Sequence, residues 1–543
     1  MTVKKDPMIP DGEVNPIDTD YQVGQDNVVV KVGPFGLDVH NRVFAVSGAL
    51  VVLFVVLTLA FHAQMEPLFS GAKNWLTSQM DGFFLVAGNI FVLLCLGLVV
   101  SPLGRVRLGG TEAKPDYSYV AWFSMLFAAG MGIGLMFFGV SEPLAHFGSA
   151  FGGVASDGGV RTDWAPLAGA AGDAGAATRL GMAATIYHWA LHPWAIYAVL
   201  ALGLALFSFN KGLPLTIRSV FYPLLGERVW GWPGHCIDIL AVIATLFGLA
   251  TSLGFGAAQA SSGLNFLFGI PQGTTTQVVL IVVITALALT SVVAGLDAGV
   301  KRLSELNMLL ALLLLLFVVA VGPTADILSG IVGNAVAYVQ HLPALSNPLG
   351  REDVNFLQGW TAFYWAWWIS WSPFVGMFIA RVSRGRTVRE FLIAVLIVPS
   401  LACTLWMTVF GETAISQVVR DGYQAAAEAE LPLQLFMVLD ALPMAQITSL
   451  LGIILVVVFF VTSSDSGSLV VDFIAAGGKV DAPLPQRVFW AVLQGLTAAV
   501  LMLGGGLVAL QAMAVSTGFP FAIVLLVACV AIVKGLISEP RWR

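Results

Sequence analysis

The sequence predicts an all-α polytopic membrane protein with twelve transmembrane helices. Apolar residues make up 58% of the 543-residue chain and charged residues 11%, whereas about a quarter of the residues of a soluble chain are charged. A helix needs about 20 mostly apolar residues to cross a bilayer, and twelve segments come close to or exceed that length. We expect these spans at residues 43–61, 83–101, 119–140, 180–207, 238–268, 276–296, 307–328, 355–382, 390–412, 446–472, 488–506 and 512–534.

The basic residues predict the orientation of these spans. If both termini are cytoplasmic, all but five of the 26 Lys and Arg residues fall on the cytoplasmic side, as the positive-inside rule requires. The exceptions are Lys73, Arg161, Arg179, Arg351 and Arg420. An even number of spans agrees with both ends lying on one side of the membrane.

Charge and cysteine content exclude several classes of protein. The net charge of −6 argues against nucleic acid binding. The four cysteines are scattered and indicate neither a disulfide framework nor a metal site. No nucleophile–base pair stands out, so we do not expect an enzyme. The first 40 residues are polar and show no cleavable signal peptide, so the first span is the expected insertion signal.

The chain divides into five parts. We expect a mostly disordered cytoplasmic tail at 1–40, two peripheral transmembrane helices within 41–118, a first five-helix repeat at 119–340, a second at 341–534, and a short cytoplasmic C-terminus at 535–543. The repeats would comprise spans three to seven and eight to twelve. An odd number of spans in each repeat inverts the second copy.

Interrupted helices at corresponding positions are the sequence sign of such repeats. The first span of the first repeat contains Gly130-Met131-Gly132-Ile133-Gly134, and the first span of the second contains Ser372-Pro373 and Gly376. We expect both helices to open there. Each glycine costs about 1 kcal/mol relative to Ala in a helix. The glycine stretch is therefore either an unwound segment that meets a cation and a carboxylate or a close helix contact.

The most unusual segment is a run of tryptophans in the eighth span. Five of the fifteen tryptophans lie within twelve residues: Trp360, Trp365, Trp367, Trp368 and Trp371. Such a run can anchor a helix at the membrane interface, or its indole faces can bind a quaternary ammonium group by cation–π attraction. The run alone supports both interpretations equally.

Further aromatic residues surround a proline in the fourth span. Trp189, Trp194 and Tyr197 lie on this span, and Trp194 and Tyr197 are three residues apart and share a helix face. They add walls to an aromatic box or form an interfacial belt. His188 and His192 have the spacing of metal ligands, but no third ligand is near in the sequence, so we interpret them as hydrogen-bonded packing residues.

A run of hydroxyl groups lies in the tenth span. Thr462-Ser463-Ser464-Asp465-Ser466-Gly467-Ser468 places polar groups where lipid makes them costly unless they are used. Hydroxyl and carbonyl oxygens suit a small hard cation, whereas bonding back to their own helix explains only some of them. Asp465 either ligates a cation or braces a neighbouring helix. Glu142 and Glu412 lie near span ends, where we expect them to be solvated.

Together these segments resemble the betaine/choline/carnitine transporter family, and within it the sodium-coupled glycine betaine transporters. The resemblance covers nearly everything after about residue 35. It is carried by Gly130–Gly134, Ser141-Glu142-Pro143, His188–Tyr197, Phe363–Phe374 with Arg384–Thr387, and Thr462–Gly467. It implies the leucine-transporter-type fold with inverted five-helix repeats, a homotrimer in the bacterial inner membrane, and ion-coupled uptake of trimethylammonium-like osmoprotectants.

The resemblance also assigns residues to sites. The substrate residues it implies are Trp189, Trp194, Tyr197, Trp367, Trp368 and Trp371, with the backbone of Gly132 and Gly134. The implied first Na+ site uses the carbonyl groups of Ala128, Met131 and Phe459 and the hydroxyls of Thr462 and Ser463. A second Na+ site would use Thr245 and Phe374, but Leu249 stands where a second hydroxyl is expected, and Thr251 is the candidate to compensate.

One position discriminates among substrates. Choline carriers of this family tend to carry Asp where this chain has Gly134, so the resemblance favours a zwitterion such as glycine betaine. Residues 235–300 contain no Lys or Arg that could replace the ions. We therefore expect sodium symport of glycine betaine or a related trimethylammonium or sulfonium zwitterion. The alternatives are a proton-coupled choline or dimethylsulfoniopropionate carrier and a solute sensor without transport, against which the short C-terminus argues.

Overall fold

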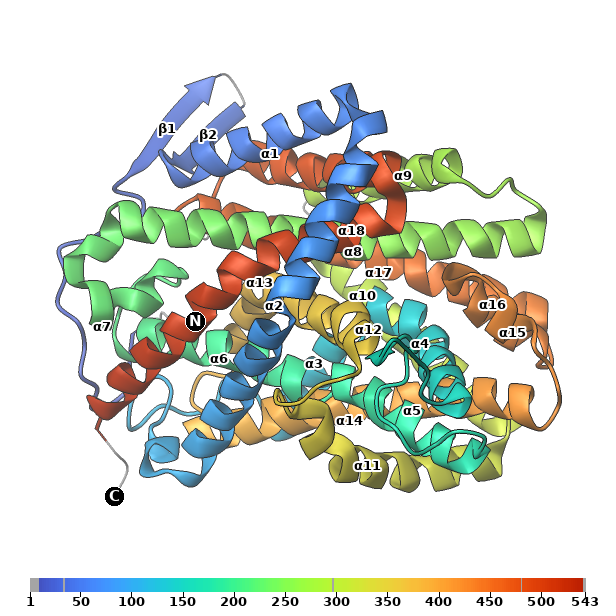
Figure 1. Cartoon of the computed structure of the whole chain (residues 1–543). Coiled ribbons are helices and arrows are strands. Elements are labelled where there is room, and N and C mark those ends of the chain that lie inside the picture. The colour runs from blue at the N-terminus through green and yellow to red at the C-terminus, as the bar shows by residue number, and fades with distance from the viewer. Residues whose placement is uncertain (1–8, 33–34, 295–296, 480, 541–543) are drawn as a thin grey trace.

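The computed structural model describes residues 9–32, 35–294, 297–479 and 481–540. The basic residues Lys4, Lys5, Arg541 and Arg543, which contribute to the predicted orientation, lie outside the described residues. The described chain is mostly helical, with two small hairpins, β1 (Asn27–Val32) with β2 (Phe35–His40) and β3 (Ser156–Asp157) with β4 (Val160–Arg161). Figure 1 shows the first hairpin beside α1 at one corner of the molecule.

Most of the long helices follow the predicted apolar segments, whereas the helix at Thr324–Ser346 lies mostly between the predicted spans 307–328 and 355–382. The long helices are α1 (Val43–Ala60), α2 (His62–Val100), α3 (Tyr119–Gly130), α4 (Ile133–Gly152), α5 (Ala174–Trp189), α6 (Leu191–Ala205), α8 (Trp232–Phe268), α9 (Thr274–Ala294), α10 (Asp297–Val321), α11 (Thr324–Ser346), α13 (Ala362–Val382), α14 (Val388–Val419), α17 (Ala445–Ala475) and α18 (Leu484–Ile537). Short helices are α7 (Tyr222–Leu225), α12 (Val354–Phe356), α15 (Ala425–Glu428) and α16 (Gln434–Asp440), with π-helical turns at Leu206–Asn210 and Leu357–Thr361 and 3-10 turns at Pro102–Arg105, Arg218–Phe221, Gly226–Trp230 and Leu431–Leu433.

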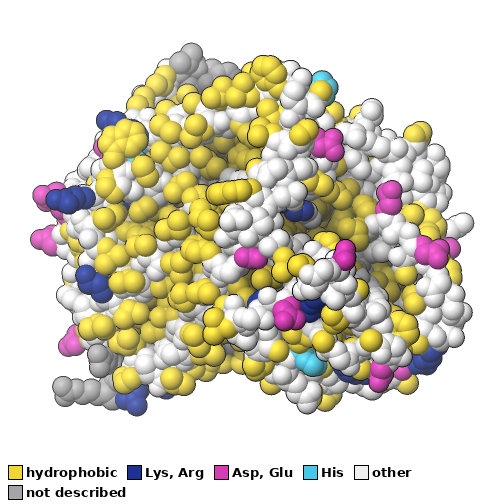
Figure 2. All heavy atoms as spheres, in the orientation of Figure 1, with side chains coloured by type: hydrophobic (Ala, Val, Ile, Leu, Met, Phe, Trp, Pro, Cys, Tyr) yellow, Lys and Arg dark blue, Asp and Glu magenta, His cyan; other side chains and the backbone are white. Residues whose placement is uncertain are grey.

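Within the described ranges, nine helices are long and apolar enough to cross a membrane, or ten if α3 and α4 count as one bent span. Helix α18 covers the two predicted spans 488–506 and 512–534, and Gly505 and Gly506, with non-helical backbone angles, form a kink between them. Figure 2 shows a broad hydrophobic surface on one side of the molecule with charged side chains mostly near its margins. The protein is a multi-pass membrane protein, while the count of twelve and the inverted repeats stay predictions.

The helices pack in a bundle centred on α8. Helix α8 contacts α17 and α18, and α13 packs against α6, α8 and α18. Figure 1 shows α8 and α18 running through the middle of the molecule while α2 crosses in front of them. The broken pair α3 and α4 contacts α14, and α4 also contacts α5 and α8. This arrangement brings the tryptophan run, the glycine stretch and the hydroxyl run together.

The expectation of a mostly disordered tail at 1–40 is wrong for its described part. The β1–β2 hairpin is held by Asn27, whose Nδ2 donates to Asp38 Oδ1 at 2.7 Å and to Ala476 O at 2.9 Å, and by an ion pair between Asp38 and Lys479. Nearer the N-terminus, Arg384 donates to Ile9 O at 3.0 Å. The polar composition cannot build a core, but its polar groups pair with the loops of the bundle instead.

The expectation that α13 opens at Pro373 is also wrong. Proline removes the N–H that would bond to the carbonyl four residues earlier. Here Ser372 Oγ donates to that carbonyl, Ile369 O, at 2.7 Å, so the helix continues from Ala362 to Val382. At Gly376 an added Cβ would lie 3.4 Å from Ala201 N on α6, which identifies this glycine as a helix-packing position.

Candidate functional site

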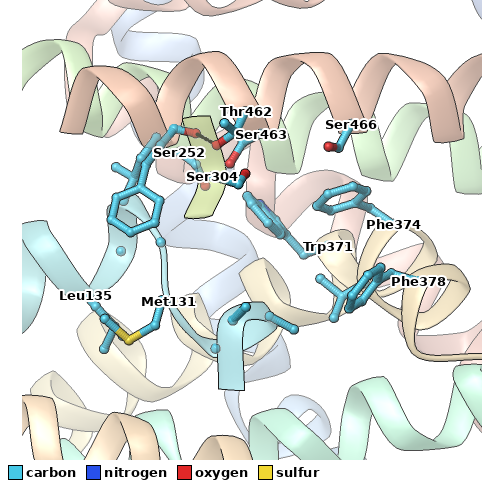
Figure 3. Close-up of a pocket in the computed structure, with 18 of the residues that line it drawn as sticks. Met131, Leu135, Ser252, Ser304, Trp371, Phe374, Phe378, Thr462, Ser463 and Ser466 are labelled. Atoms are coloured by element: carbon cyan, nitrogen blue, oxygen red, sulfur yellow. Dashed lines mark hydrogen bonds between the residues drawn. The ribbon is translucent and has the colours of Figure 1, made fainter. Parts of the chain in front are cut away.

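A cavity of about 280 Å3 lies where the break between α3 and α4 meets α8, α10, α13 and α17. It unites the three segments that the sequence singles out. Figure 3 shows Thr462 and Ser463 side by side on α17, Trp371 and Phe374 on α13, and Met131 on the linker between α3 and α4.

The aromatic wall of the cavity consists of Trp189, Tyr197, Trp367, Trp368 and Trp371. Trp368 lies at right angles to Trp189, with ring centroids 5.0 Å apart, and stacks on Trp367 at 5.6 Å. Its Nε1 donates to His188 O at 3.0 Å, a carbonyl in the last turn of α5. The orientation of this indole is therefore fixed by a hydrogen bond as well as by packing.

Helical periodicity divides the tryptophan run into two groups. Trp371 lies four residues after Trp367 and three after Trp368, and all three line the cavity side of α13. Trp365 lies on another face and stacks on His192 at 5.3 Å, while Trp360 packs edge-on against His146 at 4.8 Å. Only part of the run therefore lines the cavity.

Trp194 does not line the cavity. Its ring packs against Tyr197, with centroids 5.3 Å apart, and it lies close to Gly130 at the end of α3. Trp194 thus supports Tyr197 from behind.

The glycine stretch is a true break. Helices α3 and α4 meet at an angle of 62°, and Met131 and Gly132 between them have extended backbones. At Gly134 an added Cβ would lie 2.7 Å from Trp189 and 3.1 Å from Trp367. A side chain here would displace two indoles. Glycine is therefore favoured at this position on steric grounds, in addition to leaving the position uncharged.

The five residues of the predicted first ion site all line the cavity: Ala128, Met131, Phe459, Thr462 and Ser463. Helix α3 ends at Gly130, so carbonyls of its last turn carry the negative end of the helix dipole. Ala128 O accepts from Met131 N at 3.2 Å and keeps a second lone pair for a cation. Thr462 Oγ1 donates to Val458 O at 3.0 Å. The donor set of carbonyl and hydroxyl oxygens fits a small hard cation.

The second predicted ion site is not assembled in the same way. Phe374 lines the cavity, but Thr245 does not, and its hydroxyl donates to Ala241 O at 2.7 Å. The side chain of Leu249 fills the space beside Gly467, where an added Cβ would lie 2.4 Å from it. Thr251 does not line the cavity either, and its hydroxyl donates to Leu510 O at 3.0 Å.

Several cavity residues were missed by the sequence reasoning. They are side chains of α10 and α13: Ser304, Asn307, Met308 and Phe378. Asn307 is 1% exposed, and neither polar atom of its amide has a hydrogen-bond partner among the described residues. A lone Asn in an otherwise apolar span was the sequence feature that could have identified this position as part of the site.

The expectation that Glu142 and Glu412 are solvated is wrong. Glu142 is fully buried; its Oε2 accepts hydrogen bonds from Trp189 Nε1 and Tyr364 Oη, both at 2.6 Å. Glu412 is buried too, with Arg179 Nη1 3.2 Å from its Oε1. Trp189, Tyr364 and Arg179 lie 47, 222 and 233 residues from their glutamates in the sequence, so the position of a glutamate within its span does not reveal these partners.

Two histidines complete the surroundings of Glu142. His188 Nδ1 and His146 Nε2 lie 2.6 Å and 3.2 Å from Glu142 Oε1, and the ligand-type atoms of the three residues lie within 4.8 Å of one another. His192 Nε2 lies 3.0 Å from Asn89 Oδ1. The histidines are hydrogen-bonded packing residues as predicted, but the fold does place further ligand-type groups beside His188.

Only part of the hydroxyl run lines the cavity, as is the case for the tryptophan run. Thr462, Ser463 and Ser466 line the cavity, whereas Ser468 Oγ donates to Asp465 O at 2.8 Å within α17. Asp465 Oδ1 lies 3.1 Å from Arg487 Nη2 on α18. The structure thus favours the bracing role for Asp465.

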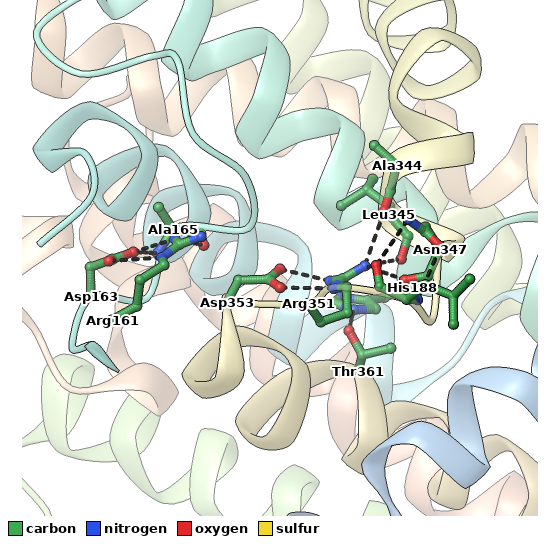
Figure 4. A network of polar contacts seen from close by, with 11 residues as sticks. Arg161, Asp163, Ala165, His188, Ala344, Leu345, Asn347, Arg351, Asp353 and Thr361 are labelled. Atoms are coloured by element: carbon green, nitrogen blue, oxygen red, sulfur yellow. Dashed lines mark hydrogen bonds and ion pairs between the residues drawn. The ribbon is translucent and has the colours of Figure 1, made fainter. Parts of the chain in front are cut away.

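The loop between α4 and α5 packs against the segment that precedes α13. Figure 4 shows two Arg–Asp pairs there, Arg161 with Asp163 and Arg351 with Asp353. Hydrogen bonds from Arg161 hold the pKa of Asp163 at about 2. Asn355 Nδ2 donates to Thr162 O and Asp163 O at 3.1 Å each. The loop is therefore fastened next to Thr361, whose hydroxyl lies 2.9 Å from His188 Nε2.

Comparison with known proteins places the chain among transporters. Residues 42–541 match the family described as BCCT, betaine/carnitine/choline family transporter. A glycine betaine/proline/choline transporter of Vibrio parahaemolyticus is 73% identical over 98% of this chain and 96% of its own length. A glycine betaine transporter of the same organism is 53% identical over 96% and 97%, and one of Bacillus subtilis is 40% identical over 92% and 95%.

Proposed function

The chain belongs to the betaine/carnitine/choline transporter family and is a solute transporter, not an enzyme, and we propose that it imports glycine betaine or a related trimethylammonium or sulfonium zwitterion together with sodium. The observation that carries the proposal is a single cavity with indole rings on one side and a broken helix facing hydroxyl groups on the other. Each part of such a solute and its ion has a matching surface there.

The aromatic wall suits the cationic end of the solute. Trp367, Trp368 and Trp371 present indole rings to the cavity, and each desolvated cation–π contact is worth up to about 2 kcal/mol. The carboxylate would meet the N-terminus of α4, which begins at Ile133 without a side-chain cap. Free N–H groups and the positive end of the helix dipole attract anions there.

The ion would bind at the other end of the same break. Carbonyls of Ala128 and Met131 in the α3 end and the hydroxyls of Thr462 and Ser463 face one cavity. Cation and carboxylate would then lie at opposite ends of one backbone break, where each favours the other. Binding of one raises the affinity for the other by the same factor, which is the requirement for symport.

One sodium ion per cycle is sufficient for useful accumulation. One net charge moving through 100 mV gains about 2.3 kcal/mol, which corresponds to roughly 50-fold accumulation. We propose a single ion, because the second set of oxygens lacks a second hydroxyl at Leu249. We also propose a homotrimer in the bacterial inner membrane with both termini in the cytoplasm, serving osmoprotection.

Transport assays in proteoliposomes test the proposal. Uptake of labelled glycine betaine should be faster with an inward sodium gradient than with potassium on both sides at the same potential. Equal rates would contradict sodium symport, and stimulation by a proton gradient alone would favour the proton-coupled choline or dimethylsulfoniopropionate carrier. Saturable binding without uptake would favour the solute sensor.

A further inference from the structure

A buried carboxylate lies directly behind the aromatic wall. Glu142 on α4 has no exposed surface. Its Oε2 accepts hydrogen bonds from the indole N–H of Trp189 and the hydroxyl of Tyr364, both at 2.6 Å. Trp189 lines the cavity, whereas Glu142 does not. The indole of Trp189 thus stands between a carboxylate and the solute space.

The hydrogen bonds around Glu142 suit an ionised carboxylate. An ionised carboxylate only accepts hydrogen bonds and has about four lone-pair sites, and an indole N–H only donates. His188 can donate from Nδ1 to Oε1 at 2.6 Å while its Nε2 accepts from the Thr361 hydroxyl at 2.9 Å. His146 Nε2 supplies a fourth donor at 3.2 Å. Every group is then satisfied with both histidines neutral.

No fixed positive charge cancels this carboxylate nearby. Across the described part of the chain, the ion-pair contacts of Glu142 are with His146 and His188, and no Lys or Arg lies within 4.0 Å of it. A charge buried without such a partner is costly, so a buried carboxylate behind the aromatic wall suggests a functional role.

The indole of Trp189 can transmit the effect of this charge to the cavity through its electron density. A carboxylate that accepts the indole N–H draws the proton toward itself and leaves more electron density on the ring, which makes the ring face more negative. Cation–π attraction depends on that negative face. The ring of Trp189 is perpendicular to Trp368, 5.0 Å away, so a cation between them would feel the added charge.

We propose that Glu142 is the counter-charge for the ammonium group and acts through Trp189, so that the cavity accepts choline as well as zwitterions. The inference rests on the proposed function, that the cavity binds a quaternary ammonium solute. Glu142 does not touch the solute and is a positioning residue. Gly134 cannot carry this charge, because a Cβ there would lie 2.7 Å from Trp189.

A neutral analogue of choline separates electrostatics from packing. In 3,3-dimethylbutan-1-ol a carbon atom replaces the nitrogen of choline, with nearly the same shape and no charge. Both compounds would compete with labelled glycine betaine for purified wild-type protein and for Glu142→Gln, which keeps the size and an acceptor oxygen. We expect the variant to lose choline affinity on the order of tenfold, with less than a twofold change for the neutral analogue. Glycine betaine should lose less than choline, because its carboxylate is repelled by the same charge.

Two further variants make the test specific. Glu412→Gln removes another buried carboxyl group, which contacts Arg179 and Asn334 and does not line the cavity, and should leave choline affinity unchanged. Trp189→Phe keeps an aromatic face without an N–H. It should lower the preference for choline over the neutral analogue by itself, and adding Glu142→Gln to it should cause no further loss.

The outcomes test the role of Glu142 separately from the proposed transport function. Equal losses for choline and its neutral analogue in Glu142→Gln, or no loss for either, would overturn the counter-charge role while the transporter function stands. An unchanged preference in Trp189→Phe would overturn it even if Glu142→Gln fails to fold. Wild-type protein that binds neither choline nor glycine betaine would overturn the proposed function and this inference with it.

Discussion

Trp368 is the residue that ties the aromatic wall together. It belongs to α13, yet its N–H is held by His188 O at the end of α5, and its ring meets Tyr197 of α6 at 5.7 Å. Its hydrogen bond orients the ring plane, so the ring face rather than the N–H edge is presented to the cavity. A single residue thus fixes the geometry between three helices.

Replacing this indole should remove a large part of solute binding. Trp368→Ala loses one cation–π contact worth up to about 2 kcal/mol, so we expect the dissociation constant for glycine betaine to rise roughly 30-fold. Equilibrium binding of labelled glycine betaine measures it. Trp75→Ala, at a 60% exposed position on α2, is the matched control. Unchanged affinity in Trp368→Ala would show that the box lies elsewhere.

At the scale of elements, α13 shows how a side chain can repair a helix. Ser372 Oγ donates to the carbonyl that Pro373 leaves without an N–H. Ser372→Ala should therefore lower the melting temperature of the detergent-solubilised protein, because a buried carbonyl loses its partner at a cost of about 1–3 kcal/mol. Ser78→Ala removes a similar bond at an exposed site on α2 and should change little. Equal melting temperatures for the two variants would contradict this account.

The β1–β2 hairpin should loosen in acid. Burial, followed by the charge of Arg218, lowers the pKa of His40 to about 3, whereas an exposed His titrates at about 6.5. Arg218 Nη1 lies 3.3 Å from His40 Nε2, and His235, Asp26 and Arg42 are the other ionisable neighbours. Because the undocked hairpin binds more protons between these two pKa values, docking is most stable above pH 6.5 and weakens as the pH falls toward 3.

Hydrogen–deuterium exchange of residues 27–32 at pH 7 and pH 5 measures this loosening, after correction for the intrinsic exchange rate. His40→Gln removes the titrating group, so its protection should depend less on pH. Protection in the wild-type protein that is equal at both pH values would contradict the role of His40.

For the molecule as a whole, the features that could be predicted from the sequence are those that composition and local motifs determine. The membrane-spanning character follows from hydropathy, and the cost of three glycines in a helix made the break at Gly130–Gly134 one of two interpretations. The site positions of Trp368 and Ser463 came from the family resemblance. The sequence could not predict that Glu142 is buried, because its partners Trp189 and Tyr364 come from other helices. Nor could it predict an ordered N-terminal segment, because that order depends on contacts with distant loops.

The arrangement of the whole cavity predicts reciprocal coupling between ion and solute. Ser463 on α17 and the α3 end face the proposed ion, while the α4 end faces the carboxylate. In the wild-type protein, sodium should therefore raise glycine betaine affinity by a factor of about 5–150 relative to potassium. Ser463→Ala removes one ligand and should bring this factor close to one while affinity in potassium stays the same. Ser468→Ala, from the same hydroxyl run but bonded within its own helix, should keep the sodium effect. Titrations of glycine betaine in both salts measure the factor. A full sodium effect in Ser463→Ala would place the ion elsewhere, because linkage requires that a variant with weaker sodium binding also show a smaller effect of sodium on glycine betaine affinity.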